Sequence, residues 1–286
     1  MDLVALQIFK TVAETGGITR AAARLHRVQS NVTTRIQQLE ERLGTRLFHR
    51  HKRRLVLSAE GKVLLEYADR LLRLAAEAQA AMRDGAPQGP LRLGALESTA
   101  AVRLPPLLSG FHLAYPKVQL ELVTGTSGAL VAKVLEGEIE AAFVAEPFTA
   151  DGLETQLAFR ERLVLITPKS FGRVRTAKDI GHASILAFAA GCSYRRRLEA
   201  WLGRSKLAPD RVMEYGSYHA IVACTAAGAG VAVVPRSVID AVQPKRDVAI
   251  HPLPADIAEA RTMLVWRIGH RSAALDALRA KLTRAK

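Results

Sequence analysis

The sequence predicts an α+β protein of several domains, in which a small helical domain with a basic hairpin, one long helix and a larger α/β domain follow one another. Three observations favour this organisation. Apolar residues at helical spacing fill the first 82 residues, the segment RDGAPQGP at 83–90 then stops any helix, and after it apolar runs alternate with helix-length stretches. A chain of 286 residues can bury more than one core.

The first element group is a set of short helices and a hairpin. Helical spacing predicts three helices within the first 43 residues. The apolar positions are Leu3, Leu6, Phe9 and Ala13, then Ala22 and Leu25, then Val32, Ile36, Leu39 and Leu43. The segment RLFHRHKRRLVLS that follows is short, β-branched at its end and basic, which is typical of a hairpin with a charged tip.

One long helix is predicted from Ser58 to about Met82. Ser58 is a good N-cap, and Glu60 lies favourably in the first turn. An apolar seam with spacings of 4, 3, 4, 3 and 4 runs along it through Leu64, Ala68, Leu71, Ala75, Ala78 and Met82. Packing on its own domain would also use such a seam, but the helix's length and its place between two domains favour a dimer contact.

The part after Pro90 has the pattern of an α/β domain. Most of its apolar runs are separated by helix-length segments, which favours a parallel sheet with helices on both faces and a ligand site at the carboxyl ends of the strands. The predicted strands are LRLGAL (91–96), VQLELV (118–123), IEAAFV (139–144), RLVLIT (162–167), SILAF (184–188), GVAVVP (230–235) and TMLVWRI (262–268).

The composition excludes several classes of protein. Two cysteines, Cys192 and Cys224, are too few for a disulfide framework. The N-terminal MDLVALQIFKTVAE lacks the features of a secretory signal, and no stretch approaches the about 20 apolar residues that span a membrane. We therefore expect a soluble, cytoplasmic protein with no membrane partner, and the residue pattern indicates no metal site and no cofactor.

The basic charge is concentrated near the N-terminus. The chain has 41 Lys and Arg against 27 Asp and Glu, a net charge of +14. Residues 1–57 carry 11 basic and four acidic side chains, so +7 of this excess lies in the first fifth of the chain. A local basic excess favours a polyanionic partner such as nucleic acid.

The third predicted helix presents a polar face. With Val32, Ile36 and Leu39 turned inward, the outer side carries Gln29, Ser30, Asn31, Thr34, Gln37 and Gln38, flanked by Thr33 and Arg35. Amides and hydroxyls of this kind read base edges in the major groove. An ordinary solvated helix face would have the same polarity, but the arginine-rich flanks favour DNA. Basic residues at the hairpin tip, among them Arg50 and Arg53, would reach phosphates or a minor groove.

Val28 stands where this helix should have its N-cap. A Ser, Thr, Asp or Asn would normally accept hydrogen bonds from the first amides of a helix, and a β-branched apolar side chain does not. We expect Val28 to pack inward as a turn residue in the small core between the helices. The amides that it leaves uncapped would then face a DNA phosphate.

The chain resembles the LysR-type transcriptional regulators over nearly its whole length. The residues at that family's spacing are Ala22, Leu25, Gln29, Ser30, Ile36, Leu39, Glu40, Leu43, Gly44, Leu47, Phe48, Arg50 and Gly61. The resemblance implies a winged helix-turn-helix at 1–58, a linker helix for dimerisation at 59–84 and an effector domain at 90–286. It also implies that the chain binds promoter DNA as a homodimer or homotetramer.

The resemblance also assigns DNA contacts. It places base-contacting side chains at Gln29, Ser30, Thr33 and Thr34, and the wing arginine at Arg53; Asn31, Arg35 and Arg50 lie beside them as further candidates. Two positions depart from the family pattern. Thr34 stands where Arg is frequent, and Val28 stands where Ser is frequent. We therefore expect a half-site preference of its own.

An effector pocket is implied between two α/β lobes like those of periplasmic binding proteins. Lobe one would span about 91–145 plus 267–286, and lobe two about 160–265. Hydroxyls and helix amides at strand ends suit an anion, so we expect a small-molecule effector, a carboxylate metabolite such as an amino acid. The candidate residues are Ser98, Thr99, Thr126, Ser127, Val144, Cys192, Ser193, Tyr194, Tyr218 and His219.

Three other functions remain as alternatives. Cys192 at a helix start would be a nucleophile in an enzyme, with His182 or His219 as its base, although no further catalytic signature accompanies it. Cys192 and Cys224 would form a disulfide in a redox-sensing regulator if they approached closely enough. A free solute-binding protein would not explain the basic N-terminal helices. The preferred interpretation is a transcriptional regulator without catalytic residues.

Overall fold

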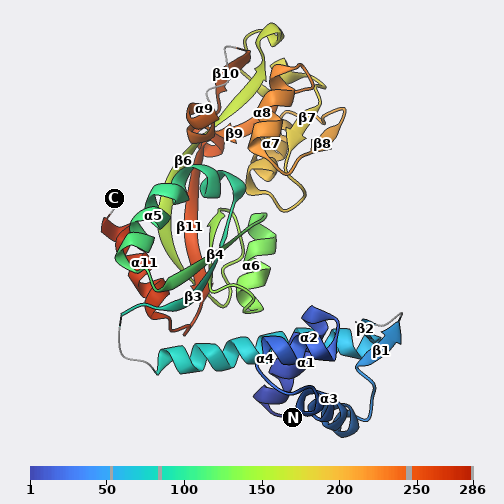
Figure 1. Cartoon of the computed structure of the whole chain (residues 1–286). Coiled ribbons are helices and arrows are strands. Elements are labelled where there is room, and N and C mark those ends of the chain that lie inside the picture. The colour runs from blue at the N-terminus through green and yellow to red at the C-terminus, as the bar shows by residue number, and fades with distance from the viewer. Residues whose placement is uncertain (52–53, 83–85, 243–246, 285–286) are drawn as a thin grey trace. The chain divides into compact units, whose positions relative to one another are not determined.

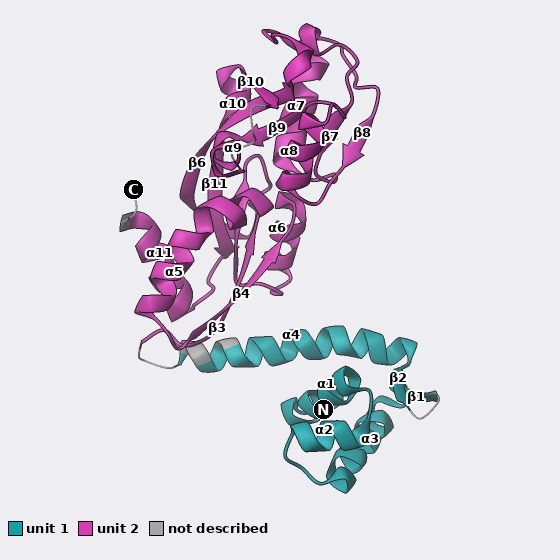
Figure 2. Ribbon diagram, turned by 45° about the horizontal axis from the view of Figure 1, so that its top comes forward, with its two compact units in different colours: residues 1–84 teal, residues 85–286 magenta. Residues whose placement is uncertain are grey.

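The computed structural model describes residues 1–51, 54–82, 86–242 and 247–284. They form two compact units, unit 1 at 1–84 and unit 2 at 85–286 (Figure 1 and Figure 2). Unit 1 has one apolar core and unit 2 has two. None of the described helices is long and apolar enough to cross a membrane.

Unit 1 contains the three short helices, the hairpin and the long helix that the sequence predicts. Its elements are α1 (Leu3–Thr15), α2 (Ile18–Arg24), α3 (Gln29–Leu43), β1 (Phe48–His51), β2 (Arg54–Leu57) and α4 (Ala59–Ala81). The apolar faces of the helices share one core, in which Phe9 and Val12 of α1 are completely buried. The two strands pair antiparallel.

Hydrogen bonds hold the hairpin against the helices. Gly16 ends α1 with a left-handed backbone (φ +65°), and its carbonyl accepts the amide of Leu55 at 3.1 Å. At the other end of the hairpin, the buried carboxylate of Glu40 on α3 accepts the amides of Leu47 at 2.8 Å and Phe48 at 3.3 Å. The hairpin therefore has a defined position beside α3.

The long helix α4 packs on unit 1 along its first half. The Ser58 hydroxyl accepts the amide of Gly61 at 2.8 Å, as predicted for an N-cap. Within the predicted apolar seam, Leu64 and Ala68 contact the core of unit 1. For these two residues the alternative of packing on the helix's own domain is therefore the correct one, because the same spacing also buries α4 against α1. The dimer contact of the helix stays a prediction.

Unit 2 combines sheets with helices on both faces. Its strands are β3 (Gly89–Ala95), β4 (Val118–Thr124), β5 (Ala141–Ala145), β6 (Leu153–Pro168), β7 (Ile185–Ala187), β8 (Val212–Glu214), β9 (Ala232–Pro235), β10 (Val248–Pro252) and β11 (Glu259–Arg267). Its longer helices are α5 (Leu104–Ala114), α6 (Ser127–Leu135), α7 (Ser193–Arg204), α8 (Tyr218–Ala226), α9 (Arg236–Val242) and α11 (Ala273–Arg284). A π-helical turn η1 (Thr99–Arg103), 3₁₀ turns η2 (Lys169–Phe171) and η3 (Ala177–Ile180), and α10 (Ala255–Ala258) are shorter.

The main sheet of unit 2 is mixed. Its seven strands follow the order β10, β6, β11, β5, β3, β4, with β9 also paired to β6. β3 runs parallel to β4 and β5, but β11 runs antiparallel to β5 and β6. The expectation of a parallel sheet is therefore wrong for the pairs that involve β6 and β11. These two strands run in opposite directions beside each other, so the sheet around them is antiparallel.

Strand β6 belongs to two lobes. Its first part pairs with β11, whereas its last part, from Leu163 to Pro168, pairs with β9 and β10. Lobe one has α5 and α11 on one face of β3, β4 and β5 and α6 on the other (Figure 1). Lobe two contains β7 to β10 with α7, α8 and α9. The register of β11 against β6 shifts between Thr262 and Met263.

Candidate DNA interface and ligand pocket

The outer face of α3 is polar and accessible. Gln29, Ser30, Asn31 and Thr34 are exposed, while Thr33 is half-buried. Two of these side chains are oriented from α2 and the turn that follows it: the Thr19 hydroxyl donates to Gln29 Oε1 at 3.3 Å, and Arg27 donates to Asn31 Oδ1 at 3.4 Å. The structure thus brings these candidates together on one surface.

Arg35 is directed away from this group. Its guanidinium lies 3.7 Å from the Asp2 carboxylate, which caps α1. The pKa of Asp2 is lowered, chiefly because the carboxylate accepts the amide of Ala5 and further because Arg35 is close. The geometry therefore favours a structural role for Arg35 at the start of α1 rather than a base contact.

Val28 does not pack inward. Its side chain is 69% exposed, its backbone is extended, and no described side chain caps the helix at this point. The prediction of an inward-facing turn residue is therefore wrong. Ala21 and Ala22 of α2 belong to the core of unit 1, and Val28 does not. The first amides of α3, which no described side chain caps, therefore lie beside an exposed residue at the surface of unit 1.

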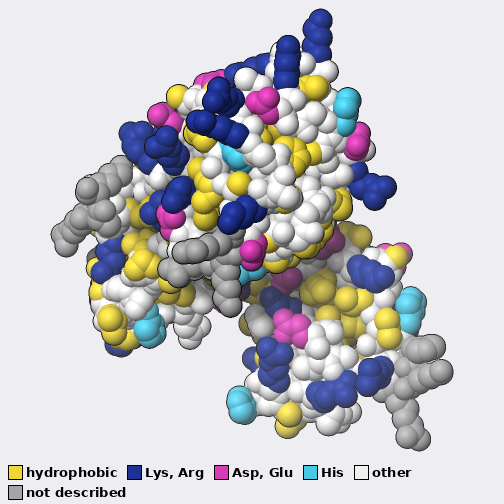
Figure 3. Space-filling model, turned by 90° about the horizontal axis from the view of Figure 1, so that it is seen from above, with side chains coloured by type: hydrophobic (Ala, Val, Ile, Leu, Met, Phe, Trp, Pro, Cys, Tyr) yellow, Lys and Arg dark blue, Asp and Glu magenta, His cyan; other side chains and the backbone are white. Residues whose placement is uncertain are grey.

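A broad groove lies between α2, α3 and the hairpin. Arg20, Arg46 and Arg50 contribute to its walls together with Thr33 and Gln37. Arg20 and Arg46 were missed by sequence analysis, although both belong to the basic excess of residues 1–57. Arg53 at the hairpin tip lies outside the described residues. On the face shown in Figure 3, Lys and Arg side chains are more prominent than Asp and Glu.

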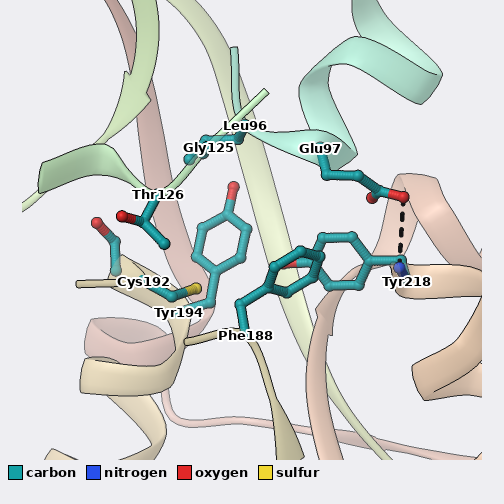
Figure 4. A pocket seen from close by; sticks show the side chains of 9 residues that line it. Leu96, Glu97, Gly125, Thr126, Phe188, Cys192, Tyr194 and Tyr218 are labelled. Carbon is teal, nitrogen blue, oxygen red and sulfur yellow. Dashed lines mark hydrogen bonds between the residues drawn. The ribbon is translucent and has the colours of Figure 1, made fainter. Parts of the chain in front are cut away.

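Unit 2 contains a small pocket where β3, α6, α7 and α8 meet. Its cavity volume is only about 10 Å³, about the size of one water molecule, so the surrounding side chains nearly close it. It is lined by Leu96, Glu97, Gly125, Thr126, Phe188, Cys192, Ser193, Tyr194 and Tyr218 (Figure 4). Five of the predicted effector residues therefore lie together, because the strand ends and helix starts of both lobes converge here.

The other predicted effector residues do not line this pocket. Ser98, Thr99, Ser127 and Val144 are buried in the walls around it, and His219 is exposed to solvent. Glu97, Leu96, Gly125 and Phe188 were missed by sequence analysis. Their positions offered a signal, because Glu97 directly precedes Ser98 and Phe188 ends a predicted strand.

The hydroxyls of Ser127 and Ser193 join the two lobes. Ser127 begins α6 in lobe one and Ser193 begins α7 in lobe two, and their oxygens lie 3.0 Å apart. Ser193 donates to the carbonyl of Ala145 at the end of β5 at 2.7 Å, and the amide of Ala145 donates to Ser127 at 3.2 Å. These hydroxyls hold two helix starts together. The Thr126 hydroxyl caps α6 by accepting the amide of Ala129 at 3.4 Å, whereas no described side chain caps the start of α7.

Two tyrosines enclose the pocket. Tyr194 is 3% exposed, and burial raises the pKa of its hydroxyl, with the charge of Glu161 adding to the effect. The hydroxyls of Ser98 and Thr262 are near, but among the described residues no atom lies within hydrogen-bond geometry of Tyr194 Oη. Tyr218 is also buried, and its ring centre lies 4.7 Å from that of Phe188.

Glu97 brings a carboxylate into the same pocket. Its Oε1 accepts the amide of Tyr218, the first residue of α8, at 3.4 Å (Figure 4). Its Oε2 is buried and has no hydrogen-bond partner within the described part of the chain. Burial raises the pKa of Glu97, while the Tyr218 amide, the nearby His219 and the neighbouring Ser217 hydroxyl oppose the shift. The side chain as a whole is half-buried.

The environment of Cys192 disfavours a reactive thiol. The side chain is buried, and burial raises the pKa of the thiol although the amides of Arg195 and Tyr194 oppose the shift. A thiol with a raised pKa is a poor nucleophile at neutral pH. Cys192 and Cys224 are both free. Among the described residues, no group of three His, Cys, Asp or Glu side chains is placed to hold a metal ion.

A helix-turn-helix unit with a basic, polar surface, followed by a two-lobed domain with its own pocket, is the organisation expected of a DNA-binding protein with a separate small-molecule domain. Residues 3–62 match the family model described as bacterial regulatory helix-turn-helix protein, lysR family. Residues 84–286 match the model described as LysR substrate binding domain. The chain belongs to the LysR family of DNA-binding transcriptional regulators, whose C-terminal domain binds an effector.

Individual relatives agree with this assignment. The HTH-type transcriptional regulator GltR of Bacillus subtilis (strain 168) is 38% identical over 268 residues, which cover 93% of this chain and 90% of GltR. The crystal structure of full-length CbnR complexed with its target DNA has a TM-score of 0.71 at 27% identity and covers 100% of both chains. A full-length OxyR variant from Pseudomonas aeruginosa has a TM-score of 0.71, 23% identity and coverage of 99% of this chain and 94% of OxyR, and shows the shared fold.

Proposed function

We propose that this regulator reads promoter DNA with the exposed residues at the start of α3. The observation that carries the proposal is the arrangement of Gln29, Ser30, Asn31 and Thr34 on one accessible face, beside a groove lined by three arginines. The side-chain amide of Gln or Asn can make two hydrogen bonds to adenine in the major groove, whereas the guanidinium of Arg can bind phosphates. The CbnR relative was crystallised with its target DNA.

Replacing Gln29 with alanine should lower discrimination between DNA sites. We expect a loss of about 1–3 kcal/mol in binding to the specific promoter and little change on random DNA, because a base contact is removed. Arg50→Ala should weaken both about equally and reduce the salt slope by about one phosphate contact. Gel-shift titrations at several salt concentrations measure both effects.

The matched control is Gln7→Ala, because Gln7 is also an exposed glutamine but lies on α1 instead of α3. It should leave both affinities unchanged. If Gln29→Ala weakened specific and random DNA by the same factor, Gln29 would be a backbone contact and the assignment of α3 as the reading face would lose its support.

We propose further that the pocket of unit 2 binds a carboxylate metabolite as effector, without catalysing a reaction on it. The starts of α6 and α7 meet at its wall, and the first amides of a helix have no partner within that helix. The burial of Cys192, which raises the pKa of its thiol, supports binding without catalysis.

A thermal-shift screen with carboxylate metabolites tests the pocket, because a ligand raises the melting temperature by mass action. Thr126→Val should reduce the shift, since it removes a hydroxyl from the lining. Thr124→Val, on an exposed residue two positions earlier, is the matched control and should preserve the shift. Binding that survives Thr126→Val unchanged would place the effector elsewhere.

We propose that α4 mediates formation of a homodimer, from which a homotetramer could be built. An exposed apolar stripe follows the helix on the side away from the core, and Tyr67, Leu74 and Met82 are 56%, 58% and 82% exposed. Its residues on α4 are Val63, Tyr67, Leu71 and Leu74, and Met82 directly follows the helix. Large exposed apolar stripes on helices are typical of coiled-coil contacts.

Leu74→Glu should convert the dimer to monomer at micromolar concentration. Burying leucine contributes about 1.5–3 kcal/mol per protomer, and a charge in the contact adds a desolvation cost, so the dissociation constant should rise about 100-fold or more. Analytical ultracentrifugation measures it.

The matched control for this variant is Ala76→Glu. It places the same charge on an exposed residue of α4 that lies about 200° around the helix from Leu74, on the side away from the stripe. It should leave the mass unchanged. An unaltered dimer in Leu74→Glu would exclude this face.

A further inference from the structure

The carboxylate of Glu97 does not fit a pocket made only for anions. It lines the same pocket as Thr126 and Ser193, and it would repel a ligand that carried nothing but negative charge. One of its oxygens accepts the Tyr218 amide, and the other is buried and has no partner within the described residues. A buried acceptor without a donor is costly unless a ligand supplies one.

The surroundings of Glu97 suit a cation. Phe188 and Tyr218 also line the pocket, with ring centres 4.7 Å apart, and aromatic faces attract ammonium groups. Figure 4 shows Glu97 at one side of the pocket and Thr126 and Cys192 at the other, with aromatic rings between them. Thr126 thus supplies a hydroxyl on one side of the pocket and Glu97 a carboxylate on the other.

We propose that Glu97 is the acceptor for an ammonium group, so that the pocket selects α-amino acids and related zwitterions and rejects carboxylic acids that lack the amine. This inference rests on the proposed carboxylate pocket and adds the second charge to it. The ligand carboxylate lies toward the starts of α6 and α7, and its ammonium group donates to Glu97 Oε2. The buried Tyr194 hydroxyl, which lacks a partner among the described residues, offers a further polar contact within the pocket.

A purely structural role for Glu97 would have different consequences. Its contact with the Tyr218 amide joins the loop after β3 in lobe one to the start of α8 in lobe two, so the side chain also holds the pocket closed. Glu97→Gln retains one oxygen that can accept this amide, removes the charge and puts an NH2 donor in place of the second acceptor oxygen. It therefore separates recognition of a cation from closure of the pocket.

The experiment uses the full chain and matched pairs of probes. Each standard L-amino acid is compared with its deaminated acid, for example L-leucine with 4-methylpentanoate and L-glutamate with glutarate, first by thermal shift and then by calorimetry. We expect at least one amino acid to bind about 10-fold or more tightly than its deaminated counterpart. In Glu97→Gln this preference should disappear, with weaker binding of the amino acid and unchanged or tighter binding of the acid.

The outcomes separate the two proposals. If deaminated acids bind as tightly as the amino acids, or if Glu97→Gln weakens both members of a pair by the same factor, the ammonium site is wrong while the carboxylate pocket stands. If neither class binds, but another carboxylate binds and Thr126→Val weakens that binding, the ammonium site is again wrong and the carboxylate pocket stands. If no carboxylate of any class binds, the pocket proposal fails and the ammonium site fails with it.

Discussion

Replacing Gly61 with alanine is expected to destabilise unit 1 by about 2–3 kcal/mol, the size of a severe overpacking. A Cβ at this position would lie 2.2 Å from the carbonyl oxygen of Leu47 and 3.0 Å from the side chain of Leu57. The first atom belongs to the backbone, and the Ser58 amide also donates to it at 2.9 Å, so it cannot move aside freely. The hairpin would separate from α4, and affinity for DNA would fall with it.

The control for this prediction is a glycine substitution that should raise, rather than lower, the free energy of unfolding. Gly203 lies in α7, and a Cβ there would meet no described atom within 4 Å. Gly203→Ala should therefore stabilise the chain by about 0.5–1 kcal/mol through helix propensity alone. Calorimetric unfolding of the two variants measures both effects. Equal stabilisation by both substitutions would mean that α4 does not approach the hairpin as closely as described.

Removing the carboxylate of Glu161 is expected to destabilise unit 2 by about 2–3 kcal/mol. Glu161 on β6 is 6% exposed and accepts two hydrogen bonds from Arg103, at 2.6 and 3.2 Å, and one from Ser237 at 2.9 Å. Arg103 belongs to η1 and Ser237 to α9, so one carboxylate joins both lobes. Breaking a fully buried ion pair costs about 3–5 kcal/mol, and the partial exposure of Arg103 lowers the figure.

Fluorescence isolates this effect, because both tryptophans of the chain, Trp201 and Trp266, lie in unit 2. Urea unfolding followed at this signal should show the loss for Glu161→Ala. Ser237→Ala should cost only about 1 kcal/mol, the net value of one hydrogen bond. A change below this for Glu161→Ala would show that water replaces the network at little cost.

The elements of unit 1 could be predicted because each is determined by local spacing. Leu3 to Ala13, Val32 to Leu43 and the Ser58 cap each fix a helix within a few turns, and the structure contains all three. The side on which α4 packs was not determined in this way. Leu64 and Ala68 satisfy both a partner contact and a contact with α1, and only the tertiary structure decides between them.

The sheet of unit 2 was harder to predict, because strand direction depends on connections between distant segments. β8 and β10 are short, and the first part of β6, with the sequence LETQLAFRE, alternates polar and apolar residues rather than forming one apolar run. The antiparallel course of β11 is fixed by pairing with β5 and β6 more than 90 residues earlier. No local pattern carries that information.

The pocket was predicted in its location more successfully than in its chemistry. Ser and Thr at helix starts indicated where strands and helices converge, and Thr126, Ser193 and Tyr194 line the pocket accordingly. The use of Ser127 and Ser193 as a bond between lobes, and the approach of Glu97 to Tyr218 across 121 positions, depend on how the lobes close. The roles of the individual site residues stay predictions.

The continuous course of β6 through both lobes restricts how unit 2 can move. Sixteen residues run without a break from Leu153 to Pro168, so one continuous strand connects the two lobes mechanically. A ligand that pulls the lobes together must therefore bend or twist β6, because this strand belongs to the sheet pairs of both lobes. The shifted register at Thr262, where the ladder is already irregular and strands twist most easily, is where that torsion would concentrate.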